Sequence, residues 1–170
     1  MNIQNNKPFK NASIKLMVFD IDGVMTDGRL YYDKQGEAFK VFNVQDGYGL
    51  KKLIDSGIRV AIITGRKSDI VACRAKDLGI NDVYQGIADK WEQLKELLKK
   101  YNLNENQAGY MGDDLIDEVA MTKVSLAVAP ANARPEILKI AHYVTDAKGG
   151  EGAVRELCDW LIEYKNNHAV

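Results

Sequence analysis

The feature that most constrains the fold is the alternation of short apolar runs with longer segments of helical periodicity. Most of these runs are apolar at consecutive positions rather than at every second one, which is typical of strands that are covered on both faces. Strands that alternate with helices in this way predict the α/β class, a Rossmann-like parallel sheet flanked by helices. The runs that predict strands are residues 14–19, 59–64, 82–85, 107–111, 124–128 and 142–145.

Five segments between or after these runs carry the signals of helices. Ser68 and Asp89 have the side chains preferred before a first helical turn, Pro135 suits a first turn, and Gly57 and Gly79 suit the position after a last one. We expect helices over residues 46–57, 68–79, 89–101, 133–141 and 152–164.

Residues 28–44 break this rhythm, because they are rich in Tyr, Phe and Val around a central DKQG. This pattern predicts a small β-hairpin inserted after the first strand. With no repeat or linker, we expect one domain over residues 14–170, in which residues 148–170 form a C-terminal tail and helix. The polar residues 1–13 predict a flexible N-terminus rather than a signal peptide.

Composition excludes several classes of function. The 23 basic and 24 acidic residues give a net charge of −1, so nothing favours a nucleic-acid partner. No apolar run approaches the roughly 18 residues that a membrane span requires. Cys73 and Cys158 are far apart and lie within helical patterns, which favours a reduced, cytoplasmic protein over a disulfide framework.

Polar side chains follow several predicted strands where each strand ends, and the carboxyl ends of parallel strands meet at one edge of a sheet. Adjacent carboxylates repel each other, so they require a nearby cation. Carboxylates with few other ligands suit Mg²⁺, and His142 and His168 are too isolated for a zinc site. The clustered residues are Asp20, Asp22, Thr64, Arg66, Lys90, Asp113 and Asp114.

This set of side chains suits the hydrolysis of phosphate esters. A strand-end Asp20 beside Mg²⁺ can attack phosphorus and form an aspartyl-phosphate. Asp22, two residues on, would point to the same side of an extended backbone and serve as general acid and then base. Lys90 and Thr64 would hold the transferring phosphoryl oxygens.

The segments DIDGV, TGR, the Lys of DKW, and GDDLID resemble, in order, the four motifs of the haloacid dehalogenase superfamily of phosphohydrolases. The resemblance covers nearly the whole chain and implies that Asp20 is the nucleophile and Asp22 the general acid/base. It also implies that Asp20, the backbone carbonyl of Asp22, and Asp113 bind Mg²⁺, supported by Asp114 or Asp117. Relatives usually close the site with a cap domain, for which this chain has only the 28–44 hairpin.

Four segments are similar to a capless bacterial subfamily: FDIDGVMTDGRLYYDKQGE, FNVQDGYGLKKL, ITGRKSDIVACRAKDLGI and GGEGAVRELCDW. Its members dephosphorylate 3-deoxy-D-manno-octulosonate 8-phosphate in lipopolysaccharide precursor synthesis. The resemblance implies a homotetramer built through the 28–44 hairpins and a mobile GGEGAVRE tail that covers a neighbour's active site. It also implies that the sugar acid phosphate contacts Asp22, Asn43, Val44, Gln45, Asp46, Gly47, Arg66, Arg74 and Lys90.

Several alternatives remain open at this point. Phosphatases of nine-carbon, sialic-type sugar acids share much of the pattern. A receiver domain of bacterial signalling also uses aspartates, Thr, Lys and Mg²⁺, but its acceptor aspartate lies on a middle strand; an idle regulatory domain of the same fold is a further possibility. Asp113 and Asp114 can be a helix cap alone, Arg66 and Arg74 solvated charges, and the hairpin aromatics Tyr31, Tyr32, Phe39 and Phe42 part of a monomer core.

Overall fold

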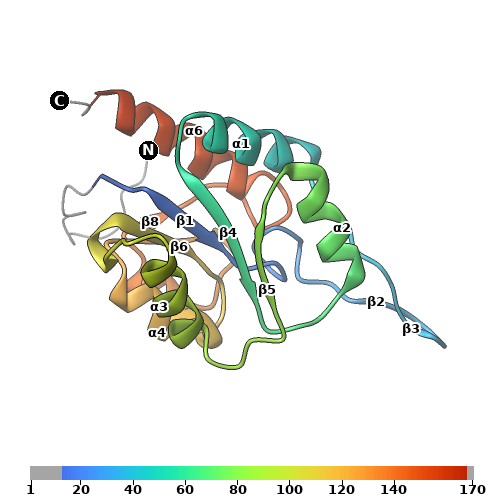
Figure 1. Cartoon of the computed structure of the whole chain (residues 1–170). Coiled ribbons are helices and arrows are strands. Elements are labelled where there is room, and N and C mark those ends of the chain that lie inside the picture. Colours follow the sequence, from blue (N-terminus) through green and yellow to red (C-terminus); the bar gives the residue numbers. More distant parts are fainter. Residues whose placement is uncertain (1–12, 168–170) are drawn as a thin grey trace.

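The computed structural model describes residues 13–167 and contains a six-stranded parallel sheet in the order β5-β4-β1-β6-β7-β8 (Figure 1). The expected flexible segment 1–13 lies, except for Ser13, outside these residues. Each of the six strands predicted from the sequence is present. They are β1 (Leu16–Phe19), β4 (Arg59–Thr64), β5 (Asp82–Gln85), β6 (Ala108–Met111), β7 (Leu126–Ala129) and β8 (Tyr143–Val144).

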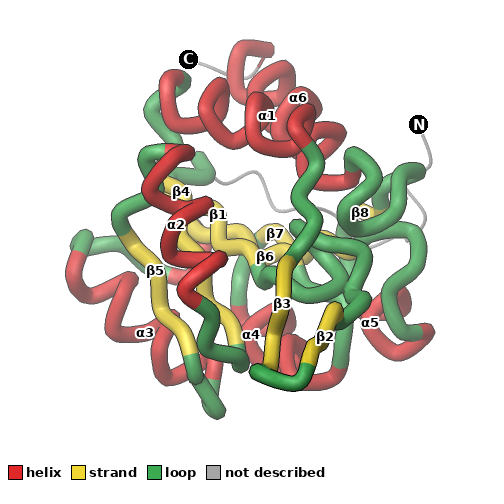
Figure 2. The backbone as a smooth tube through the Cα atoms, turned by 90° about the vertical axis from the view of Figure 1, so that its right-hand side faces the viewer, coloured by secondary structure: helices red, strands yellow, loops and turns green. Residues whose placement is uncertain are grey.

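Helices cover both faces of the sheet (Figure 2). One face carries α1 (Val44–Asp55), α2 (Asp69–Leu78) and α6 (Ala153–Asn167). The opposite face carries α3 (Lys90–Lys100), α4 (Glu118–Lys123) and α5 (Pro135–Ile140). Two short 3₁₀ helices, η1 (Glu105–Gln107) and η2 (Leu115–Asp117), precede β6 and α4.

Strand β1 shows why its sequence is apolar at every position. Met17 and Phe19 pack into the core beneath α1, α2 and α6, whereas Leu16 and Val18 pack into the core beneath α3, α4 and α5. All four side chains are inaccessible to solvent. Burying each of them contributes about 1.5–3 kcal/mol, so the strand that leads into Asp20 is firmly fixed.

Helix α1 begins earlier than predicted. Its N-cap is Asn43, whose side chain accepts a hydrogen bond from the backbone N–H of Gln45. The predicted start at Asp46 was wrong because Asp46 already lies in the first turn of the helix. Helix α4 was not among the predicted helices, since six residues are too few to show a clear helical period.

The inserted hairpin consists of β2 (Tyr31–Asp33) and β3 (Gly36–Phe39), which pair as a separate antiparallel sheet. It projects from the body of the molecule in Figure 1. Tyr31 and Phe39 stack with their ring centroids 4.5 Å apart. The side chains of Leu30, Tyr32, Phe39 and Val41 are exposed, so the hairpin aromatics do not all belong to the core of a single chain.

The loop before α6 packs against the turn that follows β1. The backbone N–H of Gly150 donates to the carbonyl of Val24 at 3.0 Å, and that of Gly149 to the side chain of Asn132 at 2.9 Å. A Cβ on Gly149 would lie 1.8 Å from the carbonyl oxygen of Gly23, so only glycine fits there. Within the GGEGAVRE segment, Gly149 and Gly150 thus pack on their own chain, and α6 begins at Ala153. The mobility expected of this segment stays a prediction.

Among residues 13–167, no helix combines the length and the apolar composition of a membrane span. Cys73 is exposed and Cys158 buried, and neither forms a disulfide.

Candidate active site

The acidic pair after β1 lies on a tight turn rather than on an extended strand. The carbonyl of Ile21 accepts hydrogen bonds from the N–H groups of Val24, Met25 and Thr26 at 2.9–3.2 Å. The expectation that Asp22 continues the extended backbone of Asp20 is thus wrong, because the chain turns at Ile21. The two carboxylates consequently face different partners.

Asp20 lies in a buried network with Lys90 and Asp117. The Nζ atom of Lys90 lies 2.6 Å from Asp20 Oδ2 and 2.6 Å from Asp117 Oδ1. Burial and the charge of Asp117 raise the pKa of Asp20 to about 6, although Lys90 acts in the opposite direction. Burial would lower the pKa of Lys90, but the two carboxylates outweigh it and raise this pKa above its usual value.

Asp117 organises the loop after β6. Its Oδ1 also accepts from the hydroxyl of the buried Tyr110 at 3.0 Å, and its Oδ2 accepts from the backbone N–H groups of Asp113 and Asp114. Both of its oxygen atoms are therefore occupied by donors from the chain, which suits a supporting role. Asp114 is exposed and is the N-cap of η2, so the capping interpretation holds for this residue.

Asp113 lies against the turn after β1. A Cβ on Gly23 would lie 2.0 Å from Asp113 Oδ2, and Gly23 has a φ of +88°. Asp113 Oδ1 is buried and has no hydrogen-bond partner among residues 13–167. Burial and the neighbouring carboxylates of Asp117 and Asp20 raise the pKa of Asp113 to about 8.

Carboxylate oxygens of Asp20, Asp113 and Asp117 lie within 4.8 Å of one another. Three acidic groups at this separation repel each other unless a cation balances them. The unpaired oxygen of Asp113 is free to bind such a cation, and an all-oxygen donor set suits Mg²⁺. The residues present therefore fit a magnesium ion held by Asp20 and Asp113.

Asp22 faces the base of the hairpin. Its Oδ1 lies 2.5 Å from Lys40 Nζ, and its Oδ2 lies 3.7 Å from Arg66 Nε. Lys40 also lies 3.0 Å from Glu37 Oε1, and the hydroxyl of Ser68 donates to Glu37 Oε2. Lys40 and Glu37 were not predicted from the sequence. Their only signal there is a pair of charged residues on either side of Ala38 and Phe39.

The remaining predicted residues of TGR and of α2 lie as follows. Thr64 is the last residue of β4 and is buried. Arg66 precedes α2 and donates a hydrogen bond to the hydroxyl of Tyr32 at 2.5 Å. Arg74 lies within α2, and its guanidinium lies over the ring of Phe42. In the described part of the chain, the Nε atoms of both arginines are buried without a hydrogen-bond partner. Arg66 therefore lies outside α2, which begins only at Asp69, and the two arginines do not lie on one helix.

The segment Asn43–Gly47 forms the start of α1. Val44 and Gln45 are exposed, and Gly47 lies beside Arg74, because a Cβ there would lie 2.3 Å from Arg74 Nη2. Asp46 is buried, and its Oδ1 accepts from the backbone N–H of Arg155 at 2.8 Å. Its carboxylate thus holds the first turn of α6 against α1, which is a structural contact within the chain.

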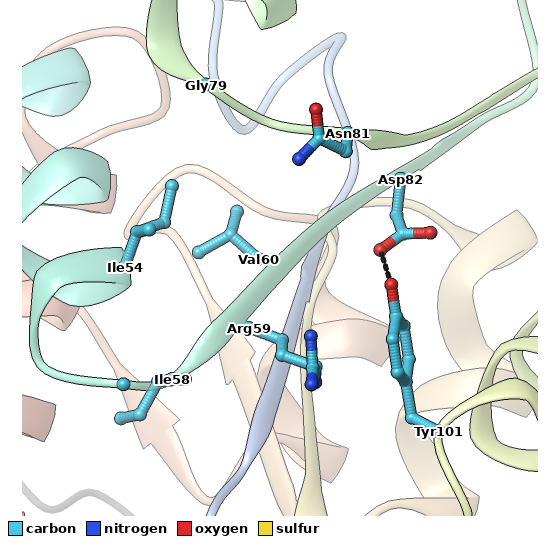
Figure 3. Close-up of a pocket in the computed structure, with 9 residues that line it drawn as sticks. Ile54, Ile58, Arg59, Val60, Gly79, Asn81, Asp82 and Tyr101 are labelled. Carbon is cyan, nitrogen blue, oxygen red and sulfur yellow. Dashed lines mark hydrogen bonds between the residues drawn. The ribbon is translucent and has the colours of Figure 1, made fainter.

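A cavity of about 300 Å³ lies at the opposite, amino edge of the sheet, between the starts of β4 and β5 (Figure 3). Its acidic residue, Asp82, already accepts hydrogen bonds from Lys100 and Tyr101, each at 2.6 Å. Arg59 lies over the ring of Tyr101. The cavity contains none of the residues gathered at the carboxyl edge, where the candidate active site lies.

Comparisons with known proteins agree with this geometry. Residues 67–157, more than half of the chain, match the model of the haloacid dehalogenase-like hydrolases. The phosphatase KdsC of Yersinia pestis, named for 3-deoxy-D-manno-octulosonate 8-phosphate, is 52% identical over 151 residues, covering 89% of this chain and 81% of that protein. The chain therefore belongs to the haloacid dehalogenase-like hydrolases.

Solved structures give the same result. The Moraxella catarrhalis 3-deoxy-D-manno-octulosonate 8-phosphate phosphatase, in complex with magnesium, phosphate and KDO, has a TM-score of 0.88 and 41% identity, covering 92% of this chain and 90% of that one. The cobalt-bound phosphatase of Haemophilus influenzae has a TM-score of 0.88 and 38% identity, covering 91% of this chain and 90% of that one. This chain is similar to enzymes of one phosphatase type.

Proposed function

We propose that the chain is a Mg²⁺-dependent phosphatase that hydrolyses 3-deoxy-D-manno-octulosonate 8-phosphate to 3-deoxy-D-manno-octulosonate and phosphate. Its proposed place is the cytoplasm, in the synthesis of lipopolysaccharide precursors. The observation that carries the proposal is the buried contact of Asp20 with Lys90, beside the unpaired oxygen of Asp113. The identity with phosphatases named for this substrate supports the choice of sugar.

In the proposed reaction, a carboxylate oxygen of Asp20 attacks the phosphorus, and the bond from phosphorus to the sugar oxygen breaks. Asp22 gives its proton to the departing alkoxide, so the sugar leaves as an alcohol. Asp22 then takes a proton from a water molecule that attacks the aspartyl-phosphate. The bond from phosphorus to Asp20 breaks, which frees the carboxylate and releases phosphate.

The other residues bind and orient the phosphoryl group. Asp20, Asp113 and the backbone carbonyl of Asp22 would hold Mg²⁺, which balances the negative charge on the phosphoryl oxygens when it is bound. Lys90 would contribute a second positive charge, since it is fixed at the first residue of α3 by Asp20 and Asp117. Thr64 would contact a phosphoryl oxygen from the end of β4.

Two arginines suit the carboxylate of a sugar acid. Within residues 13–167, the buried Nε atoms of Arg66 and Arg74 have no hydrogen-bond partner, and a buried donor without a hydrogen bond is costly. A carboxylate pairs with a guanidinium through charge-assisted hydrogen bonds. Arg66 also lies beside Asp22, and the start of α1 at Asn43, Val44 and Gln45 would contribute polar groups around the sugar.

A panel of phosphorylated sugars tests this function. Purified protein with Mg²⁺ is assayed for phosphate release from eight-carbon and nine-carbon sugar acid phosphates and from neutral hexose phosphates. We expect the highest kcat/KM for the eight-carbon substrate. A higher value for a nine-carbon, sialic-type sugar contradicts the proposed substrate, whereas a single stoichiometric phosphorylation without turnover contradicts the phosphatase activity.

The proposed assembly is a homotetramer formed through the 28–44 hairpins. Exposed Leu30, Tyr32, Phe39 and Val41 lie on or beside the two hairpin strands, and contiguous exposed apolar side chains mark interaction surfaces. Sedimentation at micromolar concentration should give the mass of four chains. Val41→Asp should shift the protein towards smaller species, and a monomeric wild-type protein would refute the assembly.

A further inference from the structure

Lys40 occupies an unusual position for a lysine. Its side chain is only 2% exposed, and its Nζ lies 2.5 Å from Asp22 Oδ1 and 3.0 Å from Glu37 Oε1. Lysine is seldom fully buried unless it is paired, because removing its charge from water is costly. The two carboxylates offset this cost, so Lys40 is held at one place between them.

Glu37 is itself tied to the body of the molecule. The hydroxyl of Ser68, the N-cap residue of α2, donates to Glu37 Oε2. The backbone N–H of Ser68 donates in turn to the side chain of Gln85, at the end of β5, at 2.7 Å. Lys40 is thus linked through Glu37 to an element of the central sheet and not only to the projecting hairpin.

Asp22, by contrast, has little else to orient it. It lies on the turn after β1, and its side chain is 20% exposed. The other cation beside it, Arg66, is 3.7 Å away, which is beyond hydrogen-bonding distance. Within residues 13–167, Lys40 therefore makes the shortest side-chain contact with the Asp22 carboxylate.

We infer that Lys40 is a positioning residue, which holds the Asp22 carboxylate where it exchanges a proton with the leaving sugar oxygen. The inference rests on the proposed function, in which Asp22 is the general acid and base. A displacement of about 1 Å in a reacting group can lower the rate by about 100-fold. Loss of Lys40 should therefore slow the chemistry more than it weakens substrate binding.

The first test compares Lys40→Met with Lys40→Arg, with Lys99→Met as the matched control on the exposed last turn of α3. With the eight-carbon substrate and Mg²⁺, we expect Lys40→Met to lower kcat by about 100-fold and to leave KM nearly unchanged. Lys40→Arg keeps the charge and should recover part of the loss, and Lys99→Met should match the wild type. A kcat of Lys40→Met within about twofold of the wild type overturns the inference.

The second test separates positioning of the acid from a general structural defect. A sugar alkoxide needs a proton as it leaves, whereas p-nitrophenolate leaves readily without one. The two substrates are the eight-carbon sugar phosphate and p-nitrophenyl phosphate, each used in single turnovers with excess enzyme. Lys40→Met should slow release of the sugar far more than release of p-nitrophenol. Equal slowing of both substrates means a structural defect and overturns the inference.

Two controls keep these outcomes distinct. If the wild-type protein fails to hydrolyse either substrate, the proposed function fails; if the wild type is active and Lys40→Met equals it, only the role of Lys40 fails. If circular dichroism shows that Lys40→Met does not fold, Ser68→Ala decides, because it frees Glu37 without removing either charge. Ser68→Ala should change the ratio of the two release rates in the same direction, and an unchanged ratio overturns the inference.

Discussion

The Nζ atom of Lys90 lies 2.6 Å from Oδ2 of Asp20, although the two residues are 70 positions apart in the sequence. Both side chains are buried, where the second carboxylate of Asp117 completes the pairing of Lys90. Removing one partner of such a group leaves an uncompensated charge, which costs about 3–5 kcal/mol. A mutation at this site therefore has to preserve the packing and the hydrogen bonds of Lys90, so that a loss of activity is not simply a loss of folding.

Asp20→Asn meets this condition, because the amide oxygen of asparagine can still accept from Lys90. We expect turnover of the sugar phosphate to fall below about 1% of the wild type, since the attacking carboxylate is lost. Acid-quenched protein should carry no covalent phosphate, while the circular dichroism spectrum should be unchanged. Asp77→Asn, on the exposed part of α2, is the matched control. Residual activity of more than a few per cent would count against Asp20 as the nucleophile.

Removal of divalent metal should abolish activity, because Asp20 and Asp113 would then repel the phosphoryl group without a balancing cation. EDTA should abolish phosphate release by the enzyme, and excess Mg²⁺ should restore it. Mg²⁺ should also raise the melting temperature, since a ligand stabilises the state that binds it. Asp113→Asn should lose most of this thermal shift. An enzyme indifferent to chelation would refute the metal site.

Gly23→Ala should damage the site by direct collision, because the new Cβ would lie 2.0 Å from Asp113 Oδ2. Gly79→Ala provides a control with a similar backbone strain, since Gly79 has a φ of +74° and no atom within 4 Å of the added Cβ. Each variant should lose about 1–2 kcal/mol from the left-handed conformation. Only Gly23→Ala should also lose the Mg²⁺-dependent thermal shift and the activity. Equal activity of the two variants would contradict this account.

Asp82 should give the fold a pH-dependent contribution, independent of the active site. Burial opposes its ionisation, but hydrogen bonds from Lys100 and Tyr101 outweigh burial and hold its pKa below the usual 3.8. The unfolded chain therefore takes up the proton first, so the contribution is present above about pH 4 and is lost as the pH falls through the folded-state pKa.

Urea unfolding of the wild type and of Asp82→Asn checks this expectation. The wild type should be the more stable at pH 7, and the difference between the two midpoints should shrink as the pH is lowered below 4. A difference that stays constant over this range would show that Asp82 does not act through its charge. Asp77→Asn serves again as the control, because Asp77 is exposed.

Most of the fold could be predicted because its signals are local. Six apolar runs, glycine at helix ends and polar N-caps depend on neighbouring residues only, and the structure contains all six strands. Helix α4 was missed because it has six residues. The start of α1 was misplaced because Asn43 and Asp46 are both good capping residues, and only the contact of Asp46 with α6 separates them.

The gathering of side chains at the carboxyl edge could be predicted, because the order of the strands alone brings them together. The carboxyl edge brings together three side chains because each comes shortly after the end of a strand. These are Asp20, Lys90 and Asp113. The direction of Asp22 could not be predicted, since it depends on the turn at Ile21. The ion pair of Asp22 with Lys40 could not be predicted either, because it depends on how the hairpin folds back on the turn.

The packing of Gly149 and Gly150 on residues 23–27 has a consequence for synthesis of the protein. Gly149, which packs on the turn that carries the acidic pair, follows Gly23 of that turn by 126 positions, so it is synthesised much later. A partly translated chain can thus contain the whole DIDG segment without its final support. The phosphatase centre would reach its working shape only after residues 149 and 150 have been synthesised.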